Sequence, residues 1–306
     1  MPTLASDHYF TIGSSHARAG EPCQDYALSG ALKDTRVYGI VTDGCSGANA
    51  RTDLGARVLA LALEAELQHT TSLDDCFTPV FVQRIRDRLQ SMPLGGTPQD
   101  YLASIVAFCA NAATAKVFMA GDGAFAVRNI DGTVQTTEAS WPDNAPCYLG
   151  YCLQPLVVSQ FSAAASAVNC AISVQLCTHT TNADTSICDT PAQDFLQGWT
   201  TQINLDKITA LAVFSDGISQ ISRMNVPNVA TAFLAFKNFE GSFVKRRAMK
   251  ALAQWERIGH IPQDDISIAA LARFAAGPPQ GATPPLGFSD PQSVGAWAPS
   301  PGASAP

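Results

Sequence analysis

The sequence VYGIVTDGCSGANART, residues 37–52, holds the pattern on which the fold and chemistry of this chain depend. Residues 37–41 predict a short buried strand, and the apolar run ends abruptly at Asp43-Gly44. We therefore expect a carboxylate at the end of a strand, which is a rigid position for a functional group. An Asp-Gly pair also closes ordinary hairpins, so a plain turn is the alternative interpretation.

Other acidic residues share this arrangement, because each adjoins an apolar run typical of a β-strand. They are Asp25 before Tyr26–Leu28, Asp122 after Lys116–Met119, Asp216 after Leu211–Phe214, and Asp264 with Asp265 before Ile266–Ile268. Carboxylates that converge would repel one another and raise one another's pKa values unless a cation lies between them. Oxygen ligands prefer hard divalent ions such as Mg²⁺ or Mn²⁺. We therefore expect a metal site.

Composition narrows the classes of function. The 306 residues carry a net charge of −7 and are 46% hydrophobic, which suits a globular protein with a substantial core. A chain with this negative charge lacks the basic surface with which proteins bind nucleic acid, and its binding to an anionic membrane is disfavoured. We see no N-terminal leader and no apolar run of the roughly 18 residues that a spanning helix needs, so the expected location is the cytoplasm.

The nine cysteines are scattered without a repeated C-x-x-C pattern. Structural zinc needs closely paired ligands, and a disulfide framework is not expected in a chain of this size without a leader. Several cysteines lie within apolar runs, as Cys109 does, and we expect these to behave as small hydrophobic residues.

The strand pattern predicts mixed, mainly antiparallel sheets. The predicted strands are 9–13, 37–43, 103–109, 115–119, 124–130, 157–161, 171–176 and 208–214. The three strands between residues 103 and 130 predict an antiparallel meander that turns at Asp131-Gly132. Residues 14–21 are predicted to be a polar loop, residues 178–190 a polar stretch between predicted strands, and residues 138–151 a loop over a site.

Apolar positions at helical spacing predict two pairs of helices. They cover residues 52–68, with Thr52 or Asp53 as N-cap, 77–89, 229–236 and 243–258. Lys245, Arg246, Arg247 and Lys250 lie mostly on the polar face of the last helix, a pattern that favours a solvated surface over the alternative of a docking patch. Helix pairs that cover such sheets form an α+β layered architecture. Because Pro, Gly, Ala and Ser dominate from Gly277, we expect a folded domain over residues 1–275 and a disordered tail over 276–306.

In this order, the motifs resemble the metal-dependent protein serine/threonine phosphatases of type 2C, most closely their compact bacterial branch. The matching stretches are Gly13–His16, Pro22–Asp25, Thr42–Gly44 with Gly55-Ala56, Gly121–Gly123, Asn144–Pro146 with Tyr148-Leu149, Phe214–Ile218 and Asp264–Ser267. Together they cover residues 9–273. Each motif is weak alone, but their order and spacing make the set specific.

The resemblance implies a four-layer α-β-β-α sandwich of two mainly antiparallel sheets flanked by helix pairs, with two Mn²⁺ or Mg²⁺ ions at one end. Asp43 would bridge the ions, with the Gly44 carbonyl on one of them, and Asp216 and Asp264 would hold the other. Asp25, with Gln24 through water, would line the centre, and Asp122 with Asp216 would hold a third, weaker ion. Water activated at the two metals would attack phosphoserine or phosphothreonine directly.

Two positions depart from the family pattern. Gln24 stands where many members have Glu, which removes one charge from the metal centre. Gly20 stands where an Arg usually grips phosphate, and Arg18, His16 and Arg51 are the candidates to replace it. Both departures leave open a catalytically silent protein that binds phosphoproteins.

A different chemistry is suggested by Cys45 and Arg51, whose C-x₅-R spacing is that of a Cys-based phosphatase loop. That interpretation explains none of the downstream Asp positions. If the chain is a metal-dependent phosphatase, we expect its partner to be a protein phosphorylated on Ser or Thr, such as a cognate kinase or the substrate of that kinase. We expect it to bind neither nucleic acid nor membrane and to be a monomer.

Overall fold

The computed structural model describes residues 3–45, 51–93, 95–142, 145–166, 173–181, 185–195 and 197–274. The predicted tail, residues 46–50 and Asn144 lie outside this set, so the expectations for them remain predictions. The strands are β1 Thr3–Thr11, β2 Asp25–Ala31, β3 Val37–Gly44, β4 Ala103–Ala110, β5 Thr114–Ala120, β6 Gly123–Asn129, β7 Val134–Ser140, β8 Ser173–Thr180, β9 Ser186–Pro191, β10 Trp199–Asn204, β11 Ile208–Phe214 and β12 Ile266–Phe274. The helices are α1 Ser14–Ala19, α2 Thr52–Leu67, α3 Pro79–Ser91, α4 Pro155–Ser166, α5 Ala192–Phe195, α6 Val226–Phe233 and α7 Phe243–Glu256, with short 3₁₀ helices η1 Pro98–Tyr101, η3 Leu149–Leu153, η4 Leu205–Lys207 and η5 Asp216–Ser219.

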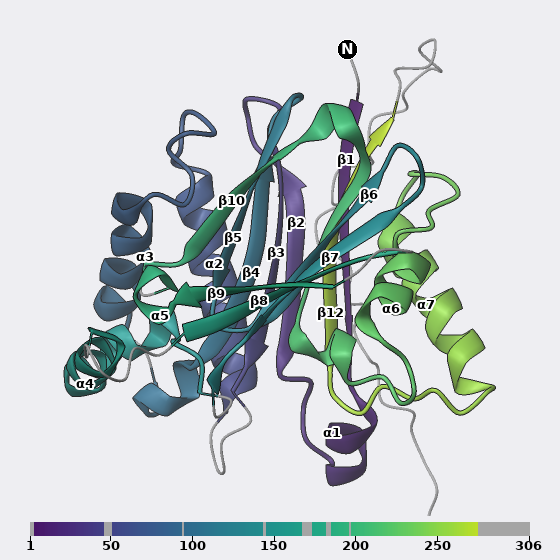
Figure 1. Ribbon diagram of the computed structural model, residues 1–306. Helices are drawn as coiled ribbons and strands as arrows, with labels where there is room; N and C mark the ends of the chain where they lie inside the picture. Colours follow the sequence, from purple (N-terminus) through teal and green to yellow (C-terminus); the bar gives the residue numbers. More distant parts are fainter. Residues whose placement is uncertain are drawn as a thin grey trace, which may run out of the picture. The chain divides into compact units, whose positions relative to one another are not determined.

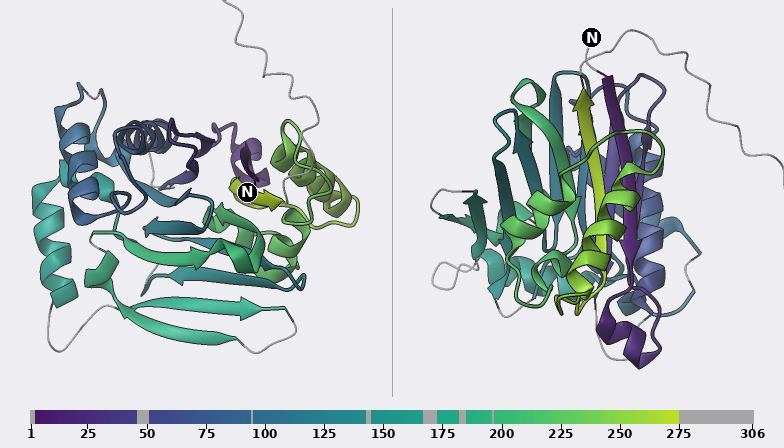
Figure 2. Two further views of the ribbon diagram at one scale, coloured as in Figure 1. Left: turned by 90° about the horizontal axis from the view of Figure 1, so that it is seen from above. Right: turned by 90° about the vertical axis from the view of Figure 1, so that its right-hand side faces the viewer.

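The strands form two antiparallel sheets. One has the order β1-β12-β11-β6-β7-β8-β9, and the other has the order β10-β5-β4-β3-β2. Figure 1 shows α2 and α3 outside the second sheet and α6 and α7 outside the first, and Figure 2 shows the two sheets stacked on each other. The predicted four-layer α-β-β-α sandwich is confirmed.

Three hydrophobic clusters fill the spaces between the layers, which explains why the central strands are apolar on both faces. Along β4, Val106 and Phe108 join the cluster between the sheets, while Ile105 and Ala107 join the cluster beneath α2 and α3. Strand β12 divides its residues in the same alternating way between the inter-sheet cluster and the one beneath α6 and α7. A strand buried on both faces shows a continuous apolar run rather than alternation.

The predicted helix pairs are present with small shifts at their ends. Thr78 caps α3 by accepting a hydrogen bond from the Phe81 backbone N–H at 3.2 Å, and Pro79 occupies the first turn. The N-cap of α2 is Arg51, which precedes both predicted positions, Thr52 and Asp53. Because Asn225 caps α6 through the Asn228 backbone N–H, that helix begins three residues earlier than predicted.

The predicted meander of residues 103–130 is wrong in its third strand. Strands β4 and β5 pair, but β6 belongs to the other sheet, between β7 and β11. Gly121 and Gly123 adopt φ values of +98° and +123°, which lets the chain cross from one sheet to the other in a few residues. The apolar pattern could not reveal this crossing, because strands of both sheets present apolar residues to the same inter-sheet core.

Several local predictions also differ from the structure. Residues 157–161, predicted as a strand, lie in α4, and the predicted polar loop 14–21 contains α1. The polar stretch 178–190 contains most of β9, and the predicted loop 138–151 begins within β7 and ends within η3. Neither β7 nor β10 was predicted as a strand. Strands β9 and β10 are the edge strands of their sheets, so they carry polar, solvent-facing residues and give little hydrophobic signal. A short apolar run such as 157–161 does not distinguish a helix from a strand.

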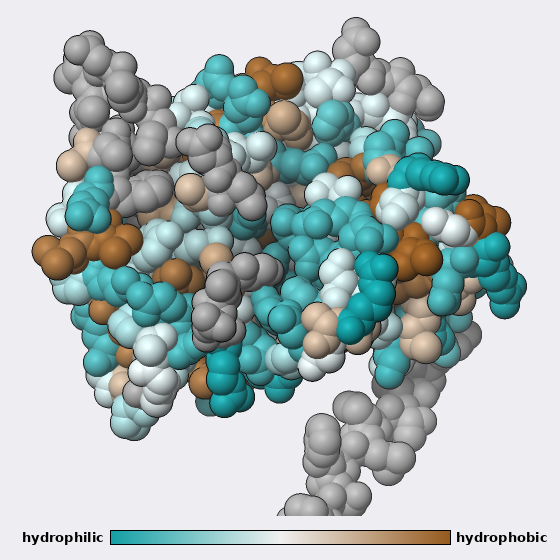
Figure 3. Space-filling model, turned by 90° about the horizontal axis from the view of Figure 1, so that it is seen from below, coloured by the Kyte–Doolittle hydropathy of each residue, from teal (hydrophilic) through white to brown (hydrophobic). Residues whose placement is uncertain are grey.

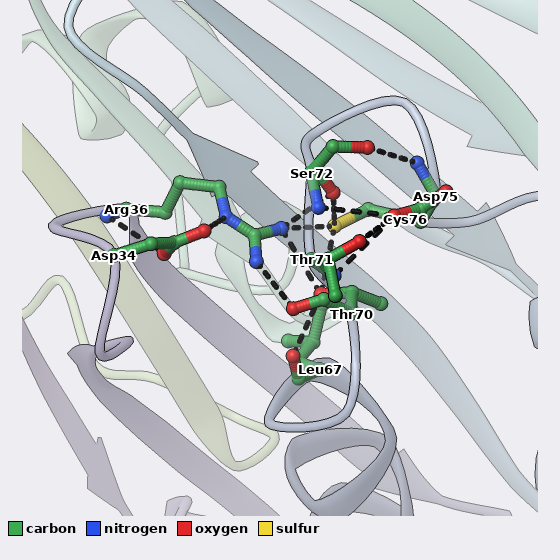
Figure 4. A network of polar contacts seen from close by, with 8 residues as sticks. All are labelled: Asp34, Arg36, Leu67, Thr70, Thr71, Ser72, Asp75 and Cys76. Carbon is green, nitrogen blue, oxygen red and sulfur yellow. Dashed lines mark hydrogen bonds and ion pairs between the residues drawn. The ribbon is translucent and has the colours of Figure 1, made fainter.

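A buried arginine ties the β2–β3 hairpin to the loop between α2 and α3 (Figure 4). Arg36 is 4% exposed and donates to Asp34 Oδ2 at 2.6 Å, Thr70 O at 2.7 Å, Ser72 O at 2.6 Å and Cys76 Sγ at 3.1 Å. The guanidinium therefore replaces its hydration with protein acceptors, and the hairpin is held against the helical layer.

Candidate metal centre

Asp25 and Asp43 lie at the adjacent ends of β2 and β3. The two residues are directly opposite in the antiparallel register, and the Gly44 backbone N–H donates to Gln24 O at 3.1 Å just beyond them. A Cβ on Gly44 would lie 2.6 Å from Thr52 O, so the start of α2 leaves no room for a side chain there. The predicted carboxylate at the end of the 37–43 strand is therefore joined by a second one from the neighbouring strand.

Asp216 reaches the same region from the other sheet. It follows β11, and the preceding residue, Ser215, donates its hydroxyl to Asp25 Oδ2 at 2.6 Å. The Ser215 hydroxyl in turn accepts from the Ser267 backbone N–H at 2.9 Å. This buried serine thus connects the strand ends of the two sheets and sets the position of Asp25 relative to Asp216.

Gln220 joins Asp216 to Asp264. Its amide nitrogen donates to Asp216 Oδ2 at 3.0 Å and to Asp264 Oδ2 at 2.9 Å. Gln220 stands four residues after Asp216, just beyond η5, and this spacing lets its side chain turn back toward the carboxylate. The two carboxylates, which are 48 positions apart in the sequence, are therefore within the span of one amide group.

Asp122 occupies the turn between β5 and β6. The Trp141 indole N–H donates to Gly121 O at 2.8 Å, so a residue of the predicted 138–151 loop fixes the turn that carries Asp122. A cavity of about 330 Å³ opens beside Asp122 and Asp216. Its other lining residues are Gly123, Ala124, Glu138, Ala139, Ser140, Trp141, Cys177, His179, Ile218 and Ser219.

Asp265 has a structural role that the sequence did not indicate. Its two carboxylate oxygens accept from the Gly13 and Gln24 backbone N–H groups, each at 2.6 Å, and the side chain is buried. His16 Nδ1 lies 3.0 Å from Asp265 Oδ2 and 3.8 Å from Asp264 Oδ1. One potential ligand atom from each of these three side chains lies within 4.8 Å of the others. Asp265 therefore anchors α1 and β2 beside the acidic cluster.

The carboxyl groups of the cluster have raised pKa values, and a cation bound between them would offset their mutual repulsion. Burial, together with the charges of Asp265 and Asp216, raises the pKa of Asp25 to about 8. Burial and the charge of Asp216 raise the pKa of Asp122 to about 6. The pKa of Asp43 also rises well above its ordinary value, because of burial and of the charges of Asp25 and Asp216. Burial and the charge of Asp216 likewise raise the pKa of Asp264. All five predicted acidic positions thus act on one another, as the sequence predicted from convergence.

Two oxygens in this cluster lack partners. Among the described residues, Asp25 Oδ1 and Asp216 Oδ1 are buried atoms without a hydrogen-bond donor. A buried carboxylate oxygen without a donor is costly unless another group compensates for it. The converging carboxylates are hard oxygen donors, with the His16 Nδ1 nitrogen beside Asp264 and Asp265, so the residues fit an Mg²⁺ or Mn²⁺ centre.

The predicted phosphate-binding residues lie in different environments. His16 is 9% exposed and faces carboxylates, with its Nε2 3.8 Å from Glu21 Oε2. Arg18 is exposed on α1 and donates its Nε to Ser14 O at 2.9 Å. Arg51 is exposed at the start of α2, where its backbone N–H donates to Asp100 Oδ1 at 2.6 Å. Cys45 follows β3 directly, but residues 46–50 of its proposed loop lie outside the described chain.

The end of the sandwich that carries α1 is seen from below in Figure 3. This face is predominantly hydrophilic, and hydrophobic residues gather toward its two sides. Such a surface suits polar ligands.

The family model for protein phosphatase 2C matches residues 12–255. The chain belongs to the protein phosphatase 2C family. It is thus a protein serine/threonine phosphatase by family, as the order of the acidic motifs predicted. The match covers each of the strand ends from Asp25 to Asp216. No curated protein sequence matches the chain.

Solved structures of the same fold are distant in sequence. The serine/threonine phosphatase Stp1 from Staphylococcus aureus superimposes with a TM-score of 0.54 at 12% identity, covering 89% of this chain and 96% of that one. The serine/threonine phosphatase of S. agalactiae gives a TM-score of 0.52 at 14% identity, over 88% and 99% of the two chains. PppA of Pseudomonas aeruginosa, described as a key regulatory component of T6SS, gives 0.50 at 12% identity, over 89% and 98%. At these identities the likeness concerns the fold.

Within the part of the chain that the structure describes, every helix is too short or too polar to span a lipid bilayer.

Proposed function

We propose that the chain hydrolyses phosphoserine and phosphothreonine in proteins at a centre of two Mn²⁺ or Mg²⁺ ions. Asp43 and the Gly44 carbonyl would contact one ion, with Asp43 bridging to a second ion held by Asp216 and Asp264. Asp122 with Asp216 would hold a third, weaker ion. The observation that carries the proposal is the buried pair of carboxylate oxygens, on Asp25 and Asp216, that have no donor among the described residues.

When bound, the ions would neutralise the carboxylates, bind the phosphoryl oxygens and activate the water that attacks phosphorus directly, without a covalent enzyme intermediate. The residues of the chain have supporting tasks. Ser215 orients Asp25 from the opposite sheet, and Gln220 holds the near oxygens of Asp216 and Asp264 side by side. Gln24, whose side-chain oxygen accepts from Thr52 at 3.2 Å, would line the centre through water.

The phosphate would also need a cationic contact from the protein, because Gly20 offers none. Arg18 and Arg51 are exposed and are free of carboxylate ion pairs among the described residues, which supports them as the gripping groups. His16, the third candidate, contacts Asp265 and would act on substrate only by turning away from it.

The partner we propose is a protein phosphorylated on Ser or Thr in the cytoplasm, such as a kinase or its substrate. We propose that the enzyme acts on it as a monomer. A silent phosphoprotein-binding module is the second candidate, favoured by Gln24 and Gly20, each of which removes a charged group from the family pattern. Ion binding distinguishes the two, because a protein that had lost its metals would show no saturable Mn²⁺ binding by calorimetry.

The direct test is hydrolysis of a small aryl phosphate and of a phosphothreonine peptide, with Mn²⁺ and then with chelator. We expect activity that requires Mn²⁺, is lost in Asp43→Ala and persists in Cys45→Ser. Metal-independent activity that disappears in Cys45→Ser would replace this mechanism with thiolate attack assisted by Arg51. Saturable Mn²⁺ binding without any turnover would favour the binding module.

A further inference from the structure

The basic run on α7 lines a pocket instead of only facing solvent. Arg246, Arg247 and Lys250 line a cavity of about 180 Å³, and Lys237 lines it from the segment that follows α6. The remaining lining residues are Ala235, Phe236, Asn238 and Phe243. Four cationic side chains from two segments therefore surround one small space, which the helical periodicity of α7 alone did not predict.

The positive charge of this pocket is not neutralised. None of its lining residues is acidic, and in the described chain none of the four cations forms an ion pair with a carboxylate. Burial and the nearby guanidinium of Arg128 lower the pKa of Arg247. The Asp7 carboxylate, whose Oδ2 accepts from the Val244 backbone N–H at 2.6 Å, forms no ion pair with these four cations in the described chain. In a protein with a net charge of −7, such a concentration of cations is a local exception.

The pocket has fixed walls. Phe236 and Phe243 pack edge to face with ring centroids 4.9 Å apart, and Arg246 donates to Asn238 Oδ1 at 2.5 Å. Arg247 donates its Nε to Ala232 O, so its guanidinium is tied to α6. Sites for drug-sized ligands have volumes of roughly 300–1,000 Å³, so a pocket of this size suits a single anionic group.

The pocket is remote from the metal centre. Phe239, beside the pocket, stacks on Phe274 at the far end of β12, whereas Asp264 and Asp265 precede the first residue of that strand. A strand of nine residues spans roughly 30 Å. Figure 1 shows the α6–α7 connection at the end of the sandwich opposite α1. A ligand in the pocket therefore cannot share its anionic group with the catalytic site.

We propose that Lys237, Arg246, Arg247 and Lys250 form a non-catalytic site that binds a phosphoserine or phosphothreonine side chain of a partner protein. A phosphate dianion matches four cations better than one carboxylate does, and guanidinium groups bind phosphate oxygens through paired hydrogen bonds. A partner that is phosphorylated at two places would then be held at the pocket while its other phosphate reaches the metal centre. The binding step itself does not depend on the proposed catalysis, because the two sites share no residue.

The test measures binding of a fluorescent phosphoserine peptide to the full chain by anisotropy, in chelator, so that turnover does not interfere. We expect Arg246→Ala/Lys250→Ala to weaken binding by about tenfold or more, since charge-assisted hydrogen bonds are lost. The matched control Lys33→Ala/Lys207→Ala removes the same charge from exposed positions elsewhere and should bind like wild type. Inorganic phosphate should compete.

Two further measurements separate the outcomes. Mn²⁺-dependent hydrolysis of a small aryl phosphate should be unchanged in Arg246→Ala/Lys250→Ala, which shows that the variant is folded and that the metal centre is intact. Equal binding by wild type and this variant would overturn the proposal. Equal binding of the phosphopeptide and of a peptide with Glu in its place would also overturn it, because the pocket would then attract negative charge without recognising phosphate.

Discussion

Asp25 and Asp43 are directly opposed on the neighbouring antiparallel strands β2 and β3. Like charges directly opposite each other destabilise a sheet, and both carboxyl groups here also face Asp216. The fold therefore includes an unfavourable interaction at the ends of β2 and β3, where Asp25 is buried. A bound divalent cation would turn that repulsion into attraction, so folding and metal binding should be coupled.

The first prediction concerns the pH dependence of stability in chelator. The pKa of Asp25 is about 8 in the folded protein, well above the value of about 3.9 for an unfolded Asp, so the native state binds more protons across that interval. The contribution of Asp25 to the free energy of unfolding is then fully present below about pH 4, and it is lost as the pH rises toward 8. Differential scanning fluorimetry should show a falling melting temperature, by roughly 2–4 °C for each kcal/mol lost.

Asp25→Asn should flatten this pH slope, because the amide stays neutral and its oxygen can still accept from Ser215. Asp74→Asn, at a side chain that is 95% exposed, is the control and should leave the slope unchanged. Saturating Mn²⁺ should raise the melting temperature of the wild type more at pH 8 than at pH 5. A wild-type slope that matches that of Asp25→Asn would contradict the prediction.

The second prediction concerns Gly217, which follows Asp216. A Cβ at this position would lie 1.8 Å from the Asp265 backbone oxygen, so Gly217→Ala must push η5 away from the start of β12. We expect destabilisation of about 1–3 kcal/mol, measured by urea unfolding, and a rise of about tenfold in the Mn²⁺ concentration for half-maximal activity. Gly95→Ala is the matched control, because nothing lies within 4 Å of the added atom. Unchanged Mn²⁺ activation in Gly217→Ala would show that Asp216 and Asp264 need not keep their present spacing.

The third prediction concerns the buried Arg36 (Figure 4). Arg36→Ala leaves the acceptors Thr70 O and Ser72 O without a donor and should reduce the free energy of unfolding by about 3–5 kcal/mol. Arg36→Lys should recover only part of this loss, because an ammonium group cannot reproduce the planar fork. Aryl phosphate turnover per folded molecule should not change. Lys33→Ala, at an exposed neighbour, should stay within about 0.5 kcal/mol of wild type, and a similar value for Arg36→Ala would contradict the assigned role.

Much of the candidate centre could be predicted from the sequence, because its carboxylates stand where local strand signals end. Asp43 and Asp216 each follow an apolar run directly, so their positions depend on local structure that a sequence reveals. The roles of Ser215, Gln220 and Asp265 depend on contacts between segments that are 44 to 252 positions apart. No local pattern distinguishes such a serine or glutamine from an ordinary polar residue.

Some features of the fold could likewise be predicted from the sequence, and others could not. The layers could be predicted because β3, β4 and β12 are apolar on both faces, and α2 and α7 have one apolar face each. The assignment of β6 to the other sheet could not, since both sheets bury the same kind of residue against each other. Edge strands β9 and β10 were missed because exposure removes the hydrophobic signal on which strand prediction relies.

The last prediction concerns the departure at Gln24. Its side chain is 9% exposed, beside the acidic cluster, and its oxygen accepts from the Thr52 hydroxyl. Gln24→Glu keeps that acceptor and adds one negative charge, which should lower the Mn²⁺ concentration for half-maximal activity by about tenfold. In chelator the same change should lower the melting temperature, because it adds to the repulsion around Asp25. Gln99→Glu adds the same charge at an exposed site and should alter neither value. Gln24→Glu could instead lower stability in chelator and leave the Mn²⁺ concentration for half-maximal activity unchanged. Residue 24 would then feel the charges of the acidic cluster without contacting the ions. The absence of a Glu at this position would in that case not account for weak metal binding.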